Sequence, residues 1–221
     1  IEKGTKIAAH IMEVGSTDIE FKNGVFRVAG TDKKVDIQEV AKTAFNPMAL
    51  PDDVEAGFYE QSTYTPSASS FPNGCHVCEV EVDKETGQVE IVKYVAVDDV
   101  GKVVNALTLE GQIHGGIVQG AGQALMENIV YDPDNGQMLS GSFMDYCMPR
   151  ADDFCIFDIK NNPVPAKTNI LGIKGAGEAG TTGALPAVMN AVNHALRDHG
   201  TRHLEMPLTP ERVWRAINAL A

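Results

Sequence analysis

The sequence predicts an α+β fold, with mixed sheet hairpins packed against helices. Three observations favour this class: asparagine–glycine pairs separate alternating apolar runs, other segments carry helical apolar stripes, and the two kinds of element do not alternate as regular strand–helix–strand units. With 221 residues and 43% apolar content, the chain can bury one sizeable core or two small ones.

The first fifty residues predict a helix–hairpin–helix arrangement. The expected elements are a helix over 4–14, a hairpin over 18–30 and a helix over 35–45. Asn23 and Gly24 are a strong signal for a two-residue hairpin turn, and Asp36 can cap the second helix. We therefore predict a boundary between residues 1–50 and residues 51–221.

The rest of the chain predicts a long hairpin followed by helices. The expected elements are a turn at 71–74, a hairpin over 75–98, a helix over 107–128, a meander through 137–160, a helix at about 184–198 and a final helix over 210–220. Alternation in the first arm of the hairpin places Cys78, Val80 and Val82 on one face. Cys78 is therefore interpreted as a small core residue and not as a metal ligand.

Charge and hydropathy exclude several classes of partner. The formal charge of −12 comes without any basic cluster, which argues against nucleic acid or an anionic membrane surface. No apolar run approaches the length of a membrane span, and no signal peptide opens the sequence. Four cysteines without iron–sulfur spacing predict reduced thiols in the cytoplasm. Because the sequence begins at Ile1 without a Met, we expect a fragment or a processed product.

The segment 170–187, "ILGIKGAGEAGTTGALPA", contains the spacing G-x-G-x-x-G at Gly175, Gly177 and Gly180. A dinucleotide-binding fingerprint must open a strand–helix–strand unit, with an acidic residue at the end of the second strand. The sequence after Gly180 predicts mostly helices, so this interpretation is rejected.

Two interpretations of this loop remain open. Five glycines lie between residues 172 and 183, a density that indicates unusual backbone conformation or close contact. The loop is either a tight turn packed on neighbouring strands or a stretch of exposed backbone that presents Glu178. A carboxylate in a partly desolvated pocket can serve as a general base.

A second glycine-rich segment, "EGQIHGGIVQGAGQALMEN" at 110–128, leaves two similar alternatives. Its glycines permit either close packing through small residues or close approach of a bulky ligand. Gln112 lies beside Gly111, and its amide both donates and accepts hydrogen bonds, which suits a pterin-like heterocycle.

With both segments in view, the chain resembles the molybdenum-binding large subunit of the xanthine dehydrogenase, aldehyde oxidase and carbon monoxide dehydrogenase family. The matching stretches, in the family's order, are "FPNGCHVCEVEVDKETGQVEI", "VDDVGKVVNALTLEGQIHGGIVQGAGQAL" and "TNILGIKGAGEAGTTGALPAVMNAV". The resemblance covers nearly all 221 residues, and the chain is similar to the carboxy-terminal part of a longer subunit. It implies that residues 1–50 end one cofactor-binding subdomain and that 51–221 form the carboxy-terminal one.

The resemblance implies hydroxylation of a small-molecule substrate with oxygen from water, by a molybdenum cofactor whose pterin dithiolene holds the metal without direct protein ligands. Glu178 falls on the family's catalytic base. The implied cofactor contacts are Gln112, Gly111, Gly115, Lys174, Gly175, Ala176 and Gly177. The substrate, whether aldehyde, purine, N-heterocycle or carbon monoxide, is not specified by these residues.

The same resemblance implies molybdopterin as its cytosine dinucleotide, with iron–sulfur clusters and FAD on partner subunits or domains. The implied partners are the remainder of the large subunit, an iron–sulfur subunit and a flavin subunit, in a multi-subunit oligomer. The alternative hypothesis is a truncated or degenerate cofactor-binding domain, and the chain alone is expected to be inactive.

Other polar residues receive no catalytic role from the sequence. His194, His199 and His203 are not spaced to share one helical face, so no metal site is expected there. Asp98 and Asp99 are expected to end a strand and accept hydrogen bonds from backbone N–H groups. The spacing around His76, His114, Tyr146 and Arg150 assigns none of them a function.

Overall fold

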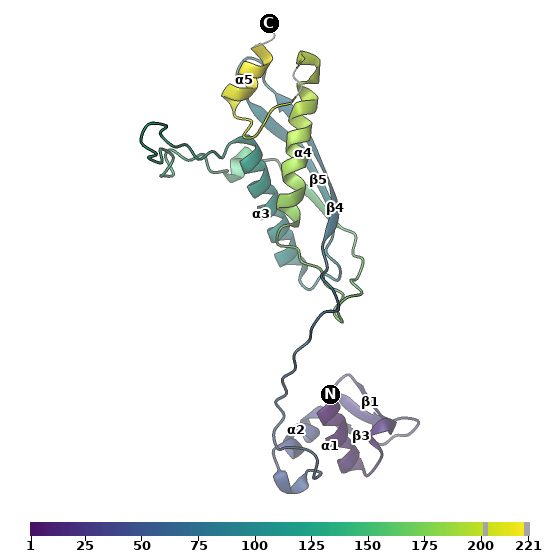
Figure 1. Ribbon diagram of the computed structural model, residues 1–221. Coiled ribbons are helices and arrows are strands. Elements are labelled where there is room, and N and C mark those ends of the chain that lie inside the picture. The colour runs from purple at the N-terminus through teal and green to yellow at the C-terminus, as the bar shows by residue number, and fades with distance from the viewer. Residues whose placement is uncertain (201–202, 219–221) are drawn as a thin grey trace. The chain divides into compact units, whose positions relative to one another are not determined.

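The computed structural model describes residues 1–200 and 203–218. Contacts divide the chain into two compact units, Ile1–Thr65 and Pro66–Ala221 (Figure 1). Each unit has its own hydrophobic core. The mixture of helices and small sheets confirms the α+β class, while the subdomain boundary at residue 50 stays a prediction.

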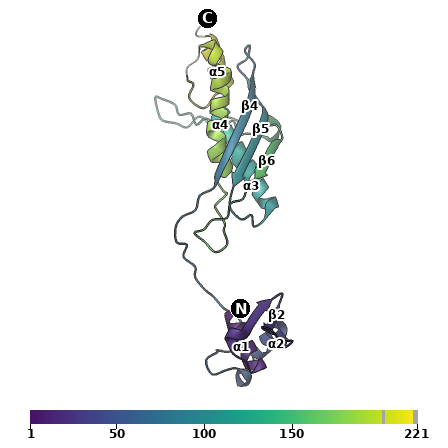
Figure 2. The ribbon, with the colours of Figure 1, turned by 90° about the vertical axis from the view of Figure 1, so that its right-hand side faces the viewer.

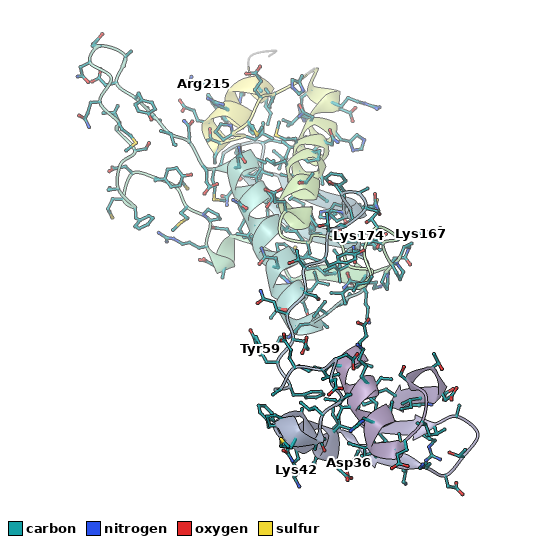
Figure 3. The ribbon with its side chains drawn as sticks, turned by 60° about the horizontal axis from the view of Figure 1, so that its bottom comes forward. Asp36, Lys42, Tyr59, Lys167, Lys174 and Arg215 are labelled. Atoms are coloured by element: carbon teal, nitrogen blue, oxygen red, sulfur yellow. The ribbon has the colours of Figure 1, made fainter. Side chains whose placement is uncertain are left out.

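The first unit is a three-stranded antiparallel sheet with two helices. Its elements are α1 (Glu2–Met12), β1 (Ile19–Lys22), β2 (Val25–Val28), β3 (Lys34–Asp36) and α2 (Ile37–Ala44), with 3-10 turns at Ser16–Asp18 and Pro47–Ala49. Asn23 and Gly24 have φ angles of 51° and 78°, which confirms the predicted hairpin turn. Asp36, labelled in Figure 3, caps α2 by accepting from the Glu39 N–H at 2.8 Å.

Strand β3 corrects the prediction that a helix begins at residue 35. Its residues pair with β2 in the register Phe26↔Val35, and Val35 is buried in the core of the first unit. Leu50, Val54 and Phe58 pack against the same core.

The second unit is built on a long hairpin, β4 (Asn73–Val82) and β5 (Val89–Asp99), which pair antiparallel. Strand β6 (Phe157–Asn161) adds parallel to β5. Side chains along β4 alternate between exposed and partly buried, and Cys78 and Val80 pack on the core, as predicted. The strand starts at Asn73, so the predicted turn at 71–74 extends too far.

Helices α3 (Ala106–Leu125) and α4 (Ala179–Ala195) lie side by side over one face of this sheet (Figures 1 and 2). The elements that follow α4 are a 3-10 turn at Arg197–His199 and α5 (Pro210–Asn218). The core of the unit is formed where helices meet sheet, and its largest fully buried side chains include Tyr94, Ile113, Ile117, Val188 and Leu196. Residues 219 and 220 of the predicted final helix lie outside the described residues.

Two predictions for the second unit were wrong. The meander through 137–160 is mostly a long loop that extends away from α3 (Figure 1), with a 3-10 turn at Ala151–Asp153 and β6 as its one regular strand. Helix α4 begins at Ala179, five residues before the predicted start. The prediction started too late because Gly180 and Gly183 disfavour a helix locally. These glycines are helical because they pack closely on neighbouring elements. No described helix is long and apolar enough to cross a membrane.

Candidate cofactor and catalytic site

The glycine-rich loop before α4 is anchored to the end of β5. Ile173 pairs with Gly101 as an isolated bridge, and the Lys174 N–H donates to the Val100 carbonyl at 2.9 Å. The Asn169 amide both accepts from the Ile173 N–H at 3.1 Å and donates to its carbonyl at 2.9 Å. The residues before Glu178 are therefore held by defined hydrogen bonds at their base.

An ion pair adds to this anchor. The Lys174 ammonium (Figure 3) contacts the Asp99 carboxylate, and the two side chains are 11% and 13% exposed. Asp99 also accepts from the N–H groups of Gly101 and Val164, both at 2.9 Å, as predicted for a residue that ends a strand. Lys174 and these donors hold the pKa of the Asp99 carboxyl well below its ordinary value. Because Asp99 engages the Lys174 side chain, Lys174 fixes the loop, and its cofactor contact stays a prediction.

Gln112 links α3 to this loop. Its Nε2 donates to the Gly177 carbonyl at 3.3 Å, although the two residues are far apart in the sequence. A cavity of about 370 Å³ is lined by Gln112, Lys174 and Ala176, together with residues at the start of α3. The structure thus brings the predicted cofactor residues of the two glycine-rich segments together.

The glycines of the two segments fall into two groups. At Gly116, Gly120 and Gly180, a Cβ atom would meet the neighbouring helix at 3.0 Å or less, so these glycines permit α3 and α4 to pack closely. Thr181 reinforces this contact by donating to the Gly116 carbonyl at 3.0 Å. For these positions the packing interpretation of the sequence is correct.

The other group has no such partner. At Gly111, Gly115 and Gly175, no atom of residues 1–200 and 203–218 lies within 4 Å of an added Cβ, and all three are exposed. Their backbone φ angles are not in the left-handed region, so neither packing nor backbone strain accounts for these glycines. They leave bare backbone beside Gln112, which fits the close approach of a flat ligand.

Glu178 stands at the end of the anchored loop, as the N-cap residue of α4. Its carbonyl accepts from the Thr182 N–H at 2.9 Å, while its side chain makes no capping hydrogen bond and is exposed. Glu178 lines a cavity of about 460 Å³, hereafter the Glu178 cavity, with His76, Asp98 and Thr182 among its other lining residues. The Glu178 side chain is thus exposed at the wall of this cavity.

The sequence missed two polar residues of this cavity wall, His76 and Asp98. Asp98 was expected to accept from backbone N–H groups, but its Oδ1 lies 3.2 Å from Nε2 of His76, and its side chain is 3% exposed. The available signal was the hairpin register, which pairs Gly74 with Asp98 and His76 with Ala96 on the face that packs under α4.

The remaining polar candidates lie elsewhere. His194 is in the last turn of α4 and His199 in the 3-10 turn after it, and neither lines the Glu178 cavity. Tyr146 and Arg150 belong to the long loop before β6. Within residues 1–200 and 203–218, no group of three or more His, Cys, Asp or Glu side chains is placed to hold a metal ion.

A larger cavity, about 710 Å³, contains none of the predicted site residues. It is lined by apolar residues such as Ile91, Leu125 and Phe154, together with Cys155. Size alone therefore does not identify the candidate site, and the grouping of Gln112 with the Glu178 loop does.

Comparison with known proteins identifies the family. A family model described as the molybdopterin cofactor-binding domain matches residues 1–155. The nicotine 6-hydroxylase large subunit of Paenarthrobacter nicotinovorans is 36% identical over 221 residues, which cover 99% of this chain and 27% of that protein. The carbon monoxide dehydrogenase large chain of Hydrogenophaga pseudoflava is 33% identical over 218 residues, 97% of this chain and 26% of the relative.

Similarity extends to three dimensions. A crystal structure of Cu,Mo-CO dehydrogenase in its carbon monoxide reduced state superposes with a TM-score of 0.93 at 32% identity, covering 99% of this chain and 27% of that one. This chain spans about a quarter of the length of these relatives. It therefore belongs to the molybdopterin cofactor-binding domain family and corresponds to a small part of the large subunit of molybdenum hydroxylases.

Proposed function

We propose that this chain is the cofactor-binding, catalytic-base portion of a molybdenum hydroxylase that uses water as its oxygen source. The substrate class is an aldehyde, a purine, an N-heterocycle or carbon monoxide. The observation that carries the proposal is the hydrogen bond from Gln112 to the Gly177 carbonyl, because it joins a bare glycine surface to the loop that presents Glu178.

The bare surface has the properties that a pterin requires. Gly111, Gly115 and Gly175 expose backbone, and no described atom lies within 4 Å of a Cβ added at any of them, so a flat heterocycle can approach closely. Gln112 lies among them with an amide whose oxygen remains available as an acceptor while its Nε2 donates to Gly177. We assign molybdopterin to this surface, in its cytosine dinucleotide form.

Glu178 is assigned the role of base. When bound, the molybdenum cofactor supplies the redox chemistry, and the protein positions it and accepts a proton. The Glu178 carboxylate suits this role because it makes no capping hydrogen bond, so its lone pairs are available. Its backbone is fixed on one side by the anchored loop and on the other by the first turn of α4. A positioned base of this kind contributes about 10²–10⁴ in rate.

The other components are assigned to partners. The relatives are named as a large subunit and a large chain. None of the cysteine spacings in this sequence matches an iron–sulfur motif, so electron export is assigned to an iron–sulfur subunit and a flavin subunit of a cytoplasmic complex.

Metal and pterin content tests the cofactor assignment. The full-length protein that contains this chain is expected to purify with molybdenum and pterin in near-stoichiometric amounts. An added Cβ at exposed Gly115 meets none of the described atoms within 4 Å, so Gly115→Leu is expected to fold, to cover the open surface and to lose both components. Gln123→Leu adds the same side chain at another exposed position of α3 and serves as the control.

Two outcomes would contradict this assignment. Full molybdenum and pterin content in Gly115→Leu would show that no ligand lies on the glycine surface. Absence of both from the wild-type protein would favour a degenerate cofactor-binding domain without activity.

A further inference from the structure

Three buried polar side chains form a hydrogen-bonded chain beside the Glu178 cavity, and two of them, His76 and Asp98, line it. His76 Nδ1 lies 2.7 Å from the Tyr94 hydroxyl, and His76 Nε2 lies 3.2 Å from Asp98 Oδ1. The His76 and Asp98 side chains are 4% and 3% exposed, and Tyr94 is fully buried. Buried polar groups are costly unless they are paired, so this arrangement constrains all three side chains.

The strand register makes room for this chain. His76 stands opposite Ala96, whose small side chain lets the imidazole reach Tyr94 and Asp98, the two diagonal neighbours on β5. Gly74 stands opposite Asp98, and a Cβ at Gly74 would lie 2.0 Å from Asp98 Oδ1. The small residues at both positions are therefore required by the polar chain.

Hydrogen-bonding capacity fixes the orientation of the imidazole. Burial raises the pKa of Tyr94, so its phenol keeps its proton. The phenol can then donate to Nδ1 of His76, while the Nε2–H donates to Asp98, which uses both ring nitrogens. Asp98 Oδ2 is buried without a hydrogen-bond partner among the described residues. Turning the ring away would also leave Oδ1 without its His76 partner, so the ring is locked in place.

Helix α4 rests directly on this locked ring. A Cβ at Gly183 would lie 2.4–2.5 Å from three atoms of the imidazole, so only glycine permits the observed contact. Gly183 follows Glu178 closely in the sequence, and the Thr182 N–H donates to the Glu178 carbonyl at 2.9 Å. The distance between the ring and Gly183 thus sets the position of the first turns of α4, and with them Glu178.

We infer that His76, locked by Asp98 and Tyr94, is a positioning residue that supports α4 at Gly183 and thereby fixes Glu178 over its cavity. Its consequence for turnover rests on the proposed role of Glu178 as the base, whereas its consequence for α4 does not. Displacement of a reacting group by about 1 Å can cost about 10²-fold in rate.

A double-mutant cycle between His76 and Gly183 tests this inference in the full-length protein with its cofactor. Gly183→Ala drives a methyl group into the locked ring, so it is expected to lower kcat about 10²-fold while leaving KM nearly unchanged. Hydrogen exchange in the peptide 178–187 is expected to accelerate about tenfold, because the first turns of α4 are displaced. In His76→Ala/Gly183→Ala, the methyl group occupies space left by the ring. The double variant is therefore expected to lose less kcat than the sum of the two single free-energy effects predicts.

Two further variants make the test specific. Gly141→Ala is the control, because its Cβ would come no closer than 3.4 Å to the Met138 side chain. Tyr94→Phe removes the hydroxyl that orients the ring and keeps the aromatic packing, so it extends the test if His76→Ala does not fold. It is expected to accelerate exchange in the peptide 178–187 without affecting the rest of the protein.

Additive effects in the cycle, or unchanged exchange in both Gly183→Ala and Tyr94→Phe, would overturn the inference. The exchange measurement does not depend on turnover. If Glu178→Gln retains activity while Gly183→Ala and Tyr94→Phe accelerate hydrogen exchange in the peptide 178–187, the proposed function fails and the support of α4 by His76 stands. If Glu178→Gln is inactive and neither Gly183→Ala nor Tyr94→Phe changes exchange in that peptide, the positioning role of His76 fails and the proposed function stands.

Discussion

Gln112 and Gly177 are joined by a hydrogen bond of 3.3 Å from the Gln112 amide to the Gly177 carbonyl, across two segments of the chain that are distant in sequence. The bond fixes the residue immediately before Glu178 against the exposed face of α3. It therefore couples the position of the proposed base to the surface on which we place the pterin.

This coupling predicts the effect of changing Gln112. Gln112→Glu keeps the size of the side chain but cannot donate to the Gly177 carbonyl at neutral pH. One such bond is worth only about 0.5–1.5 kcal/mol, so thermal unfolding should change little while turnover and pterin content fall. Gln123→Glu, at another exposed position of α3, is the comparison that shows the effect of charge alone. Wild-type turnover and pterin content in Gln112→Glu would contradict the role of this bond.

The two groups of glycines predict opposite results for the same substitution. A Cβ at Gly180 would lie 2.5 Å from the Ile113 carbonyl oxygen and 2.9 Å from the Ile117 nitrogen, and backbone atoms cannot rotate away. Gly180→Ala should destabilise the protein by about 1–3 kcal/mol, the usual cost of overpacking.

Gly111→Ala should instead be neutral or stabilising by up to about 1 kcal/mol, because alanine favours helix and its Cβ would have no atom of the described part of the chain within 4 Å. Urea unfolding of both variants measures the difference. Equal destabilisation would show that the open glycines also serve packing.

The Asp99–Lys174 ion pair predicts how the loop responds to acid. Because the folded-state pKa of Asp99 lies below its ordinary value, the carboxylate stabilises the fold above about pH 4, and this contribution is lost as pH falls through the folded value. In Asp99→Asn, the backbone amide hydrogen of Lys174 should therefore exchange with solvent faster than in the wild type at pH 5–7. The difference in stability between the two proteins should shrink in more acidic solution. A difference that grows on acidification would contradict this assignment.

The two cysteines of β4 predict different reactivity. Burial, together with nearby Cys155, raises the pKa of the Cys78 thiol to about 12, whereas Cys75 is exposed. Because the thiolate is the reactive form, iodoacetamide at pH 8 should modify Cys75 and spare Cys78 in the folded protein. Since the pKa is raised in the folded state, the contribution of Cys78 to stability is complete at neutral pH and is lost as pH rises through about 12. Mass spectrometry of the alkylated protein measures the extent of modification at Cys75 and at Cys78, and equal modification of the two would contradict the burial of Cys78.

Local signals predicted those parts of the fold that local chemistry determines. Asn23–Gly24 and the Asp36 cap are confirmed because both depend on residues close in sequence. The start of α4 was not predicted, because Gly180 disfavours a helix locally and is explained only by its contact with Gly116 on α3. The hydrogen bond between His76 and Asp98 was likewise not predicted from local sequence, because it depends on the strand register and on the packing of α4.

The central claim is that Glu178 is the base, and the most direct test is the kcat of Glu178→Gln in full-length protein with measured molybdenum and pterin content. The substitution keeps the shape of the side chain and removes the proton acceptor, and Glu79→Gln on the exposed side of β4 is the matched control. We predict that Glu178→Gln retains its cofactor and loses at least about 10²-fold in kcat. Turnover within a factor of about two of wild type, with the cofactor fully bound, would contradict the account.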